Sequence, residues 1–503
     1  MTAATPIAAA FDPSLAAQIP YTFARAHGVL AYARDGDAIV VLLRPDATVD
    51  GIAEVKRVLN SPLVTRPIAA EAFAAELARA YNQGASFAWS DEAANESDLT
   101  RLLQELPPAE DLLDTEAQAP VIRMINALLL QALRERASDL HFEPYEARSV
   151  VRFRVDGVLH DVIEPPRALH AALVSRLKIM ASLDIAEKRL PQDGRIALKL
   201  GDKQVDVRVS TLPTGSGERV VLRLLDKDSA RLDLTALGMS EETLASVDRL
   251  INEPHGIVLV TGPTGSGKTT TLYAALSRLP RGTTNMMTVE DPIEYALDGV
   301  AQTQVNPRIE LTFARALRSI LRQDPDVIMI GEIRDLETAQ IAVQASLTGH
   351  LVLATLHTND AASAVTRLAD MGVEPYLLAS SLLGVLAQRL VRTLCPECRT
   401  RVAPSAGERK LLDDLGLDAT APIWSSSGCP ACNNSGYRGR TGIYELLIVD
   451  DAIRRSIHDG AGELALRDAA LRAGMRTLRT DGARWIADGV TSLSELVRVT
   501  REQ

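Results

Sequence analysis

Apolar residues along the chain change their spacing several times, and each change predicts a different element. A short apolar run, Ala38–Leu43, predicts a strand within residues 1–90. Apolar residues then recur at helical spacing across Val121–Arg136. Three strand-like segments follow, and the second alternates apolar and polar positions: Ser149–Val155, Gln204–Ser210 and Arg219–Leu225. We therefore expect two α+β domains before residue 226.

After residue 230 the pattern becomes strand, loop and helix, repeated. Ile257–Val260 and Val327–Ile330 are typical of buried strands, and Thr270–Leu279 is typical of a helix. This alternation predicts a parallel sheet with helices on its faces. The longest apolar segment, Tyr376–Ala387, is interrupted by serines and is too short to span a bilayer, so we expect a buried helix there.

Composition sharpens this division into domains. With 503 residues the chain is too long for a single core. A polar, acidic stretch that contains Pro107 and Pro108 is typical of a linker. The patterns predict an N-terminal domain at 1–90, an acidic linker at 91–118, a second α+β domain at 119–225, a hinge at 226–229, a P-loop domain at 230–390, a tetracysteine module at 391–445 and a C-terminal helical segment at 446–503.

Charge narrows the classes of function. Hydrophobic residues make up 46% and charged residues 24%, the balance of a soluble globular protein. The formal charge is −11, from 54 Lys and Arg against 65 Asp and Glu. An acidic chain disfavours sequence-independent binding of nucleic acid. No basic segment precedes an apolar stretch at the N-terminus, so we expect no signal peptide and a cytoplasmic location.

The strongest chemical signal is a glycine-rich loop at residues 262–269, which matches G-x-x-x-x-G-K-[ST]. An apolar strand enters this loop and a helix-forming run leaves it. Its backbone N–H groups can turn inward around phosphates, with Lys268 on the β and γ phosphates and the Thr269 hydroxyl on Mg²⁺. The predicted nucleotide-binding residues are Gly262, Pro263, Thr264, Gly265, Ser266, Gly267, Lys268, Thr269 and Thr270.

Carboxylates follow two other predicted strands. Glu332 comes two residues after Val327–Ile330, where a carboxylate can act on magnesium or orient water. Glu290, Asp291 and Glu294 follow the strand-like Met286–Val289, and attack of water on a phosphate needs a positioned base. The pattern does not rank these three acids. A solvated acidic turn is the alternative interpretation.

Two histidines flank the apolar run at residues 351–356. His350 and His357 could sense a phosphate or the neighbouring carboxylates, or each could be an ordinary core residue. The sequence pattern does not choose between these interpretations.

The only cysteines form two C-x₂-C pairs, Cys395 with Cys398 and Cys429 with Cys432. Each pair can bind one side of a tetrahedral ion, and four thiolates make a closed structural zinc site. A helix around Ala406–Leu415 fits between the pairs. Redox chemistry is the weaker alternative, because neither pair lies in a βαβ pattern.

Taken in order, four stretches resemble the Walker A, Asp box, Walker B and His box of the type II/IV secretion ATPases. They are GPTGSGKTTT at 262–271, TVEDPIEY at 288–295, QDPDVIMIGEIRD at 323–335 and TGHLVLATLHTND at 348–360. The cysteine module and GYRGRTGIYE at 436–445 narrow the resemblance to the assembly ATPases of type II secretion and type IV pili. Residues 19–30 are similar to the N-terminal domain of the type II secretion ATPase.

The resemblance implies a fold and particular roles. It implies an α/β chain with a RecA-like P-loop NTPase domain, preceded by a PAS-like α+β domain and a small N-terminal α+β domain, with a zinc-binding module towards the C-terminus. It makes Glu294 the catalytic base, Glu332 the Walker B carboxylate on magnesium, and His357 the residue that senses the γ-phosphate. Arg208 and Arg223 match the arginines that reach the triphosphate. Alternatively, both arginines are solvated or salt-bridged strand residues.

The resemblance also implies partners, cofactors and a location. ATP, Mg²⁺ and Zn²⁺ are the expected cofactors. The expected assembly is a homo-hexamer, peripheral on the cytoplasmic face of the inner membrane, which drives pseudopilus assembly and protein export across the outer membrane. Its expected partners are the cytoplasmic domain of a bitopic membrane protein and a polytopic platform protein, with acidic phospholipid as a further ligand and no nucleic acid.

Three other functions fit the residues less well. A type IV pilus assembly ATPase would use the same chemistry on a different pilin. A nucleic-acid motor is disfavoured by the acidic balance, and a non-hydrolysing nucleotide switch is disfavoured by the carboxylate clusters. The choice of ATP over GTP depends on the family resemblance alone.

Overall fold

The computed structural model describes residues 11–80 apart from 17, 20, 71, 74, 75, 78 and 79, and residues 118–200, 203–226 and 233–500. The chain divides into two compact units, residues 1–227 and 228–503. Most of the predicted linker at 91–118, and the predicted hinge beyond Asp226, lie outside the described residues.

The first unit begins with a small α+β domain. Its three-stranded sheet has the order β1-β2-β3 in the described residues. The elements are α1 (Pro13–Ala16), α2 (Tyr21–His27), β1 (Val29–Asp35), β2 (Ala38–Leu43), α3 (Val49–Leu59) and β3 (Leu63–Pro67). The apolar run that predicted a strand is β2, whose four central residues are all buried. Thr48 caps α3, because its side chain accepts a hydrogen bond from the Gly51 N–H.

A second α+β domain completes this unit. Its described strands form an antiparallel sheet in the order β6-β5-β4-β9-β8-β7. The elements are α6 (Gln118–Arg134), β4 (Ala137–Pro144), β5 (Ser149–Val155), β6 (Val158–Ile163), α7 (His170–Met180), β7 (Gln192–Leu200), β8 (Lys203–Thr214) and β9 (Gly217–Asp226). The apolar face of α6 packs with α7 and the sheet around one core. The helix and the three strands predicted in this region are therefore confirmed, each within a few residues.

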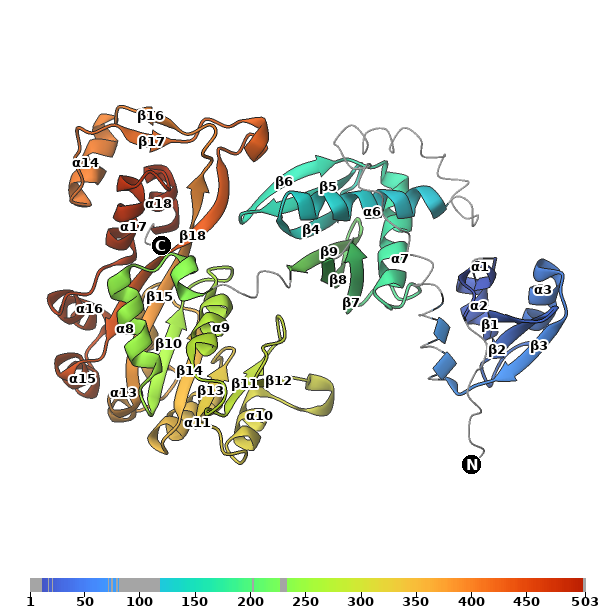
Figure 1. Cartoon of the computed structure of the whole chain (residues 1–503), viewed down its shortest axis with the longest axis horizontal. Helices are drawn as coiled ribbons and strands as arrows, with labels where there is room; N and C mark the ends of the chain where they lie inside the picture. Colours follow the sequence, from blue (N-terminus) through green and yellow to red (C-terminus); the bar gives the residue numbers. More distant parts are fainter. Residues whose placement is uncertain are drawn as a thin grey trace. The chain divides into compact units, whose positions relative to one another are not determined.

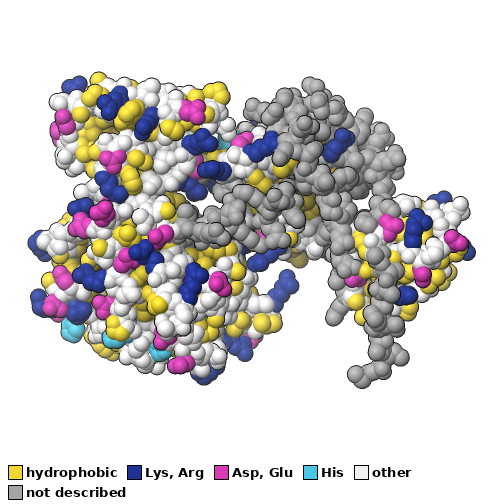
Figure 2. Space-filling model, in the orientation of Figure 1, with side chains coloured by type: hydrophobic (Ala, Val, Ile, Leu, Met, Phe, Trp, Pro, Cys, Tyr) yellow, Lys and Arg dark blue, Asp and Glu magenta, His cyan; other side chains and the backbone are white. Residues whose placement is uncertain are grey.

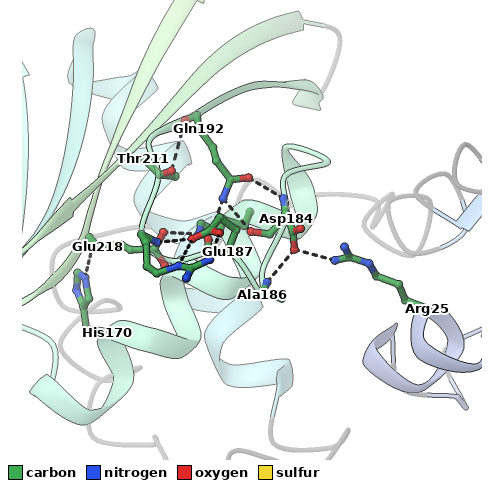
Figure 3. A network of polar contacts seen from close by, with 10 residues as sticks. Arg25, His170, Asp184, Ala186, Glu187, Gln192, Thr211 and Glu218 are labelled. Carbon is green, nitrogen blue, oxygen red and sulfur yellow. Dashed lines mark hydrogen bonds and ion pairs between the residues drawn. The ribbon is translucent and has the colours of Figure 1, made fainter.

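Polar contacts fix the segment between α7 and β7 (Figure 3). Gln192 accepts a hydrogen bond from the Asp184 N–H at 2.8 Å and donates to the Glu187 carbonyl at 3.0 Å. His170, which is buried, lies 2.7 Å from the Glu218 carbonyl. Arg25 donates to Asp184 at 3.0 Å, a bond between α2 and this segment. Direct bonding to Arg25 holds the pKa of Asp184 at about 2.

The second unit is built on a mostly parallel sheet (Figure 1). In residues 233–500 its strand order is β12-β11-β13-β14-β10-β15-β18, and only β18 runs antiparallel to its neighbour. The strands are β10 (Gly256–Thr261), β11 (Met286–Glu290), β12 (Val300–Gln304), β13 (Val327–Ile330), β14 (Leu351–Leu356), β15 (Leu382–Leu394) and β18 (Tyr437–Ile448).

Helices cover both faces of this sheet. Alternate residues of the central strands face opposite ways: Ile257 and Leu259 belong to one core, and Val258 and Val260 belong to the other. The first core includes helices α10 (Phe313–Ile320), α11 (Leu336–Leu347), α12 (Ala361–Asp370), α13 (Pro375–Ser381), α15 (Asp451–His458) and α16 (Glu463–Arg472). The second includes α8 (Glu241–Ile251) and α9 (Lys268–Arg278). The expected parallel sheet with helices on its faces is confirmed.

One predicted element is wrong. Only residues 376–381 of the expected buried helix Tyr376–Ala387 are helical, as part of α13 (Pro375–Ser381), and the remainder begins β15. The apolar run from Leu382 continues into a strand because its residues pair with the buried strand β10. Pairing within a fully buried parallel sheet makes a strand continuously apolar, which a periodicity test cannot distinguish from a buried helix.

The cysteine-bearing segment is an insertion between two strands of the same sheet. β15 and β18 pair from Gly384–Ile448 to Leu394–Tyr437, so the predicted boundary at residue 390 falls inside β15. Between them lie β16 (Thr400–Val402), α14 (Ala406–Asp414) and β17 (Ile423–Ser425). The helix expected around Ala406–Leu415 is α14, which begins at a capping box of Ser405 and Glu408. Helices α17 (Leu478–Ala487) and α18 (Leu493–Thr500) pack beside this insertion.

Candidate nucleotide site and cysteine cluster

The phosphate loop connects β10 to α9, the helix that Lys268 begins. Gly262 and Gly267 have φ of 146° and 88°. A Cβ at Gly262 would lie 2.4 Å from the Gln388 carbonyl oxygen, and a Cβ at Gly267 would lie 2.8 Å from the Gln388 side-chain nitrogen. These two positions therefore require glycine both for backbone conformation and for space.

Gln388 of β15 is hydrogen-bonded to the phosphate loop and to the helix that follows it. This side chain, which is buried, donates from Nε2 to the Ser266 carbonyl at 2.6 Å. Its Oε1 accepts from the Thr271 hydroxyl of α9 at 2.7 Å. One amide thus joins the loop to the first turn of the helix. Gln388 belongs to none of the motifs above, and Arg389 and Arg392 follow it on the same strand, so only its burial in the structure distinguishes it.

Lys268 lies under the loop with little exposure. Its Nζ donates to the carbonyl oxygens of Gly262 at 2.9 Å and Pro263 at 3.1 Å. Burial lowers the pKa of Lys268 to about 8, although the charge of Glu332 acts in the opposite direction. Its ammonium group is therefore held by loop carbonyls at the strand end where the loop begins.

Glu332 and His357 lie next to Lys268 at the ends of β13 and β14. His357 Nδ1 lies 3.5 Å from Lys268 Nζ, and His357 Nε2 lies 3.5 Å from Glu332 Oε2. Glu332 also forms an ion pair with Arg334. Burial, followed by the Lys268 charge, lowers the pKa of His357, so the imidazole is neutral near pH 7. The fold thus gathers three of the predicted site residues from three separate strand ends.

The three carboxylates after β11 have different environments. Glu290 is 2% exposed and accepts hydrogen bonds from the hydroxyls of Tyr273 and Thr288, the second at 2.6 Å. Gln302 Nε2 donates to the same carboxylate at 3.0 Å. Asp291 is exposed and Glu294 is half-buried. A carboxylate whose oxygens are occupied by three donors is poorly placed to take a proton from water, so the geometry favours Asp291 or Glu294 as the base.

His350 lies at the opposite end of β14 from His357. It is within 2.8 Å of the Ala345 carbonyl and 3.2 Å of the Thr348 hydroxyl. It lines a cavity of about 490 Å³ between α10 and α11. The two histidines therefore lie at opposite ends of the central strand β14, and of the two, His357 lies beside the phosphate loop.

Arg208 and Arg223 lie on adjacent strands of the first unit. They are direct cross-strand partners on β8 and β9. Arg223 Nε donates to Asp139 Oδ1 at 2.8 Å. Arg223 is therefore salt-bridged, as the alternative interpretation expected for a strand arginine. A role for either arginine at the triphosphate stays a prediction.

The four cysteines converge at the base of the β15–β18 insertion. Their sulfur atoms all lie within 4.8 Å of one another, with 3.9 Å between Cys395 and Cys429, 3.8 Å between Cys398 and Cys432, and 3.7 Å between Cys429 and Cys432. Thiolates about 2.3 Å from a tetrahedral zinc ion lie about 3.8 Å apart. The N–H groups of Cys429 and Gly436 both donate to Cys432 Sγ at 3.2 Å. The cluster therefore has the size, ligand set and supporting hydrogen bonds of a structural zinc site.

Acidic and basic side chains are interspersed over the visible face of the second unit (Figure 2). Such mixing of both signs is typical of a face that has no large patch of positive or negative charge alone.

None of the helices in the described part of the chain has the length and apolar character needed to cross a membrane.

A family model identifies the protein family of this chain. The model of the type II/IV secretion system protein family matches residues 114–498. The chain belongs to this family. A second model, described as a domain of GSPII protein E, matches residues 18–81, which cover the small N-terminal domain. The predicted family is thus confirmed over nearly all of the described chain.

Individual relatives show which members of the family this chain resembles. The chain is 60% identical over 486 residues to the type II secretion system protein HxcR of Pseudomonas aeruginosa, covering 96% of this chain and 99% of that protein. It is 53% identical over 489 residues to the type II secretion system ATPase E of Vibrio cholerae, covering 96% and 97%. Relatives at this level of identity carry type II secretion names, which supports secretion over the pilus alternative.

Solved structures agree on the fold. The pilus retraction motor PilT with bound ADP is 25% identical, with a TM-score of 0.51 over 75% of this chain and 96% of that one. The ATPase DotB of Legionella pneumophila is 20% identical, with a TM-score of 0.54 over 75% and 95%. The expected fold, with a P-loop ATPase domain that follows an α+β domain along the chain, is confirmed.

Proposed function

We propose that this chain hydrolyses ATP to drive protein export by type II secretion. The observation that carries the proposal is the convergence of Lys268, Glu332 and His357 beneath the phosphate loop of a secretion-family ATPase. The names of relatives at 52–60% identity support secretion as the coupled process.

Each side chain has a role that its position supports. Backbone N–H groups of residues 264–269 bind the phosphates, and the Lys268 ammonium exchanges its carbonyl contacts for phosphate oxygens. Thr269 and Glu332 would hold magnesium, which supplies positive charge to the phosphates when bound. His357, neutral and beside both Lys268 and Glu332, donates a hydrogen bond towards the γ-phosphate.

Proton abstraction from the attacking water is assigned to Glu294. Glu290 is excluded from this role because Tyr273, Thr288 and Gln302 occupy its oxygens. Asp291 is exposed to solvent, whereas Glu294 is partly enclosed by the protein. The half-buried Glu294 is the remaining acid of this segment, and the family resemblance favours the same residue.

Zinc is proposed as a structural ion of Cys395, Cys398, Cys429 and Cys432. Four thiolate ligands leave no open coordination position, so the ion would contribute folding energy to the insertion and would not take part in hydrolysis. A redox role is disfavoured because all four sulfurs share one cluster.

The assembly is proposed to be a homo-hexamer in which Arg208 and Arg223 contact the triphosphate. The N-terminal domain is proposed to bind the cytoplasmic part of a bitopic inner-membrane protein, and the motor to act on a polytopic platform protein. Location on the cytoplasmic face of the inner membrane, with acidic phospholipid as an added ligand, follows from these partners. No nucleic-acid ligand is proposed.

Phosphate release by the purified full-length chain tests the proposal. We expect hydrolysis of ATP in the presence of Mg²⁺, slower hydrolysis of GTP, and an increase on addition of the cytoplasmic part of the membrane partner with acidic vesicles. Loss of secretion in cells that produce only a hydrolysis-deficient variant is expected in parallel. Absence of hydrolysis under all these conditions, or stimulation by DNA alone, would contradict the proposal.

A further inference from the structure

The sheet of the second α+β domain places five charged residues in one row across its strands. Arg195 on β7 lies opposite Arg208 on β8, which lies opposite Arg223 on β9. Arg223 lies opposite Asp139 on β4, and Asp139 lies opposite Arg154 on β5. Directly opposite residues project from the same face of a sheet. The row therefore contains four arginines and one carboxylate.

Asp139 is the fixed member of this row. Its side chain is 6% exposed, whereas the side chain of Arg223 is 56% exposed. The Ser138 hydroxyl donates to Asp139 Oδ2 at 2.8 Å, and Arg223 Nε donates to Oδ1 at 2.8 Å. Arg154 Nε lies 3.6 Å from Oδ2. Packing and several donors thus hold the carboxylate in place, and the long arginine side chain adapts to it.

We propose that Asp139 is a positioning residue that orients Arg223 for contact with the triphosphate. This inference rests on the proposed function, in which Arg223 binds that ligand. Asp139 engages Nε, the nitrogen nearest the side-chain stem, so the bond sets the direction of the guanidinium fork. An arginine without such a bond loses more rotamer entropy when it is immobilised. Asp139 also offsets the repulsion between Arg208 and Arg223 as cross-strand neighbours.

Glu143 provides a matched control on the same strand. Its side chain is 5% exposed, and its carboxylate lies 2.7 Å from Arg219 Nη2 and 3.4 Å from Arg152 Nη1. Glu143 and Asp139 lie on the same face of β4, four residues apart. The two acids therefore share strand, face, burial and arginine pairing, but only Asp139 contacts Arg223.

The test measures ATP hydrolysis by the full-length chain over a range of ATP concentrations. Asp139→Asn retains the shape of the side chain but removes its charge, and we expect a 3- to 10-fold lower kcat with KM within twofold. Glu143→Gln should leave kcat within twofold. Added to Arg223→Ala, the Asp139→Asn change should produce no further loss, because the residue that it orients is already absent.

Several other results would overturn the positioning role of Asp139. An unchanged kcat in Asp139→Asn would overturn the inference, as would an equal loss in the presence and absence of Arg223, which indicates a purely structural role. A matching loss in Glu143→Gln would also overturn it. Melting temperatures of all variants separate misfolding from positioning. Normal turnover in Arg223→Ala would overturn the role of both residues but leave ATP hydrolysis intact, whereas absence of hydrolysis in the unmodified chain would refute the proposed function itself.

Discussion

The phosphate-loop site and the cysteine cluster lie in the same unit but are constructed in different ways. Two short C-x₂-C pairs supply all of the cluster's ligand atoms. The loop site is assembled from the ends of β10, β13 and β14, with Gln388 from β15 beneath it. A motif therefore describes the cluster completely, whereas the loop motif describes only the part of its site that contacts phosphate.

The cysteine cluster and the phosphate-loop site also differ in chemical environment. The four sulfurs face one another and form a closed set, as a structural metal requires. The loop site instead combines a buried lysine, a neutral histidine whose side chain is 46% exposed and a carboxylate that is 13% exposed. Perturbed side chains that remain accessible are typical of a site that performs chemistry. The comparison predicts that changes at the loop site alter turnover and that changes at the cluster alter stability.

The largest effect is expected from the catalytic base. Glu294→Gln should reduce kcat by about 100-fold or more with nucleotide affinity nearly unchanged, because general-base catalysis contributes about 10²–10⁴-fold. Glu290→Gln is the matched variant of the neighbouring carboxylate, and its main effect should be on stability, because it disturbs the bonds from Tyr273 and Thr288. If Glu290→Gln abolished turnover and Glu294→Gln did not, the assignment of the base would be reversed.

A smaller effect is expected from the support beneath the loop. Gln388→Ala removes both bonds to Ser266 and Thr271 and leaves a buried carbonyl and hydroxyl without this amide. Each such loss costs about 1–3 kcal/mol, so nucleotide affinity should fall about tenfold as the loop loses its conformation. Arg389→Ala changes the next residue of β15, whose side chain bonds to Asn359, and should alter affinity much less. Equal affinities for the two variants, measured by titration calorimetry, would contradict a role for Gln388.

The pH dependence of nucleotide binding should follow Lys268. Burial lowers the pKa of this ammonium to about 8, so it is charged below that pH and loses its charge as pH rises. The dissociation constant for ATP should therefore increase by up to about tenfold between pH 7 and pH 9. Because the pKa of His357 is also lowered, its imidazole stays neutral over this range. The same titration of Lys268→Ala should be flat, and a similar slope in that variant would assign the effect to another group.

The smallest effect on nucleotide binding is expected from the cysteine cluster. Cys398→Ser should remove bound zinc, measured by atomic absorption, and lower the melting temperature, while the affinity for ATP stays within about twofold. The physical reason is that a structural zinc ion contributes folding energy to its own module. Ser427→Ala, an exposed hydroxyl of the same insertion, is the control. A large loss of nucleotide affinity in Cys398→Ser alone would show that the two regions are not separable.

The sequence predicts much of the fold and part of the site. Strand β13 and the loop–helix junction at Lys268 follow from local patterns, because their apolar spacing and glycines are determined within a few residues. The first six residues of β15, within the segment Tyr376–Ala387 that the pattern predicts as a helix, form a strand because they pair with β10, more than a hundred residues away. The bond from Tyr273 of α9 to Glu290 and the bond from Gln388 to Ser266 join different elements of the fold, which spacing within a motif does not encode.

Turnover by Lys268→Ala tests the central claim most directly. The full-length variant and the unmodified chain are compared for Mg²⁺-dependent phosphate release from ATP, with melting temperatures measured to establish folding. Because Lys268 lies beneath the loop and beside His357, its removal should reduce turnover by about 100-fold or more without unfolding the unit. A folded Lys268→Ala protein that hydrolyses ATP at the unmodified rate would contradict the account.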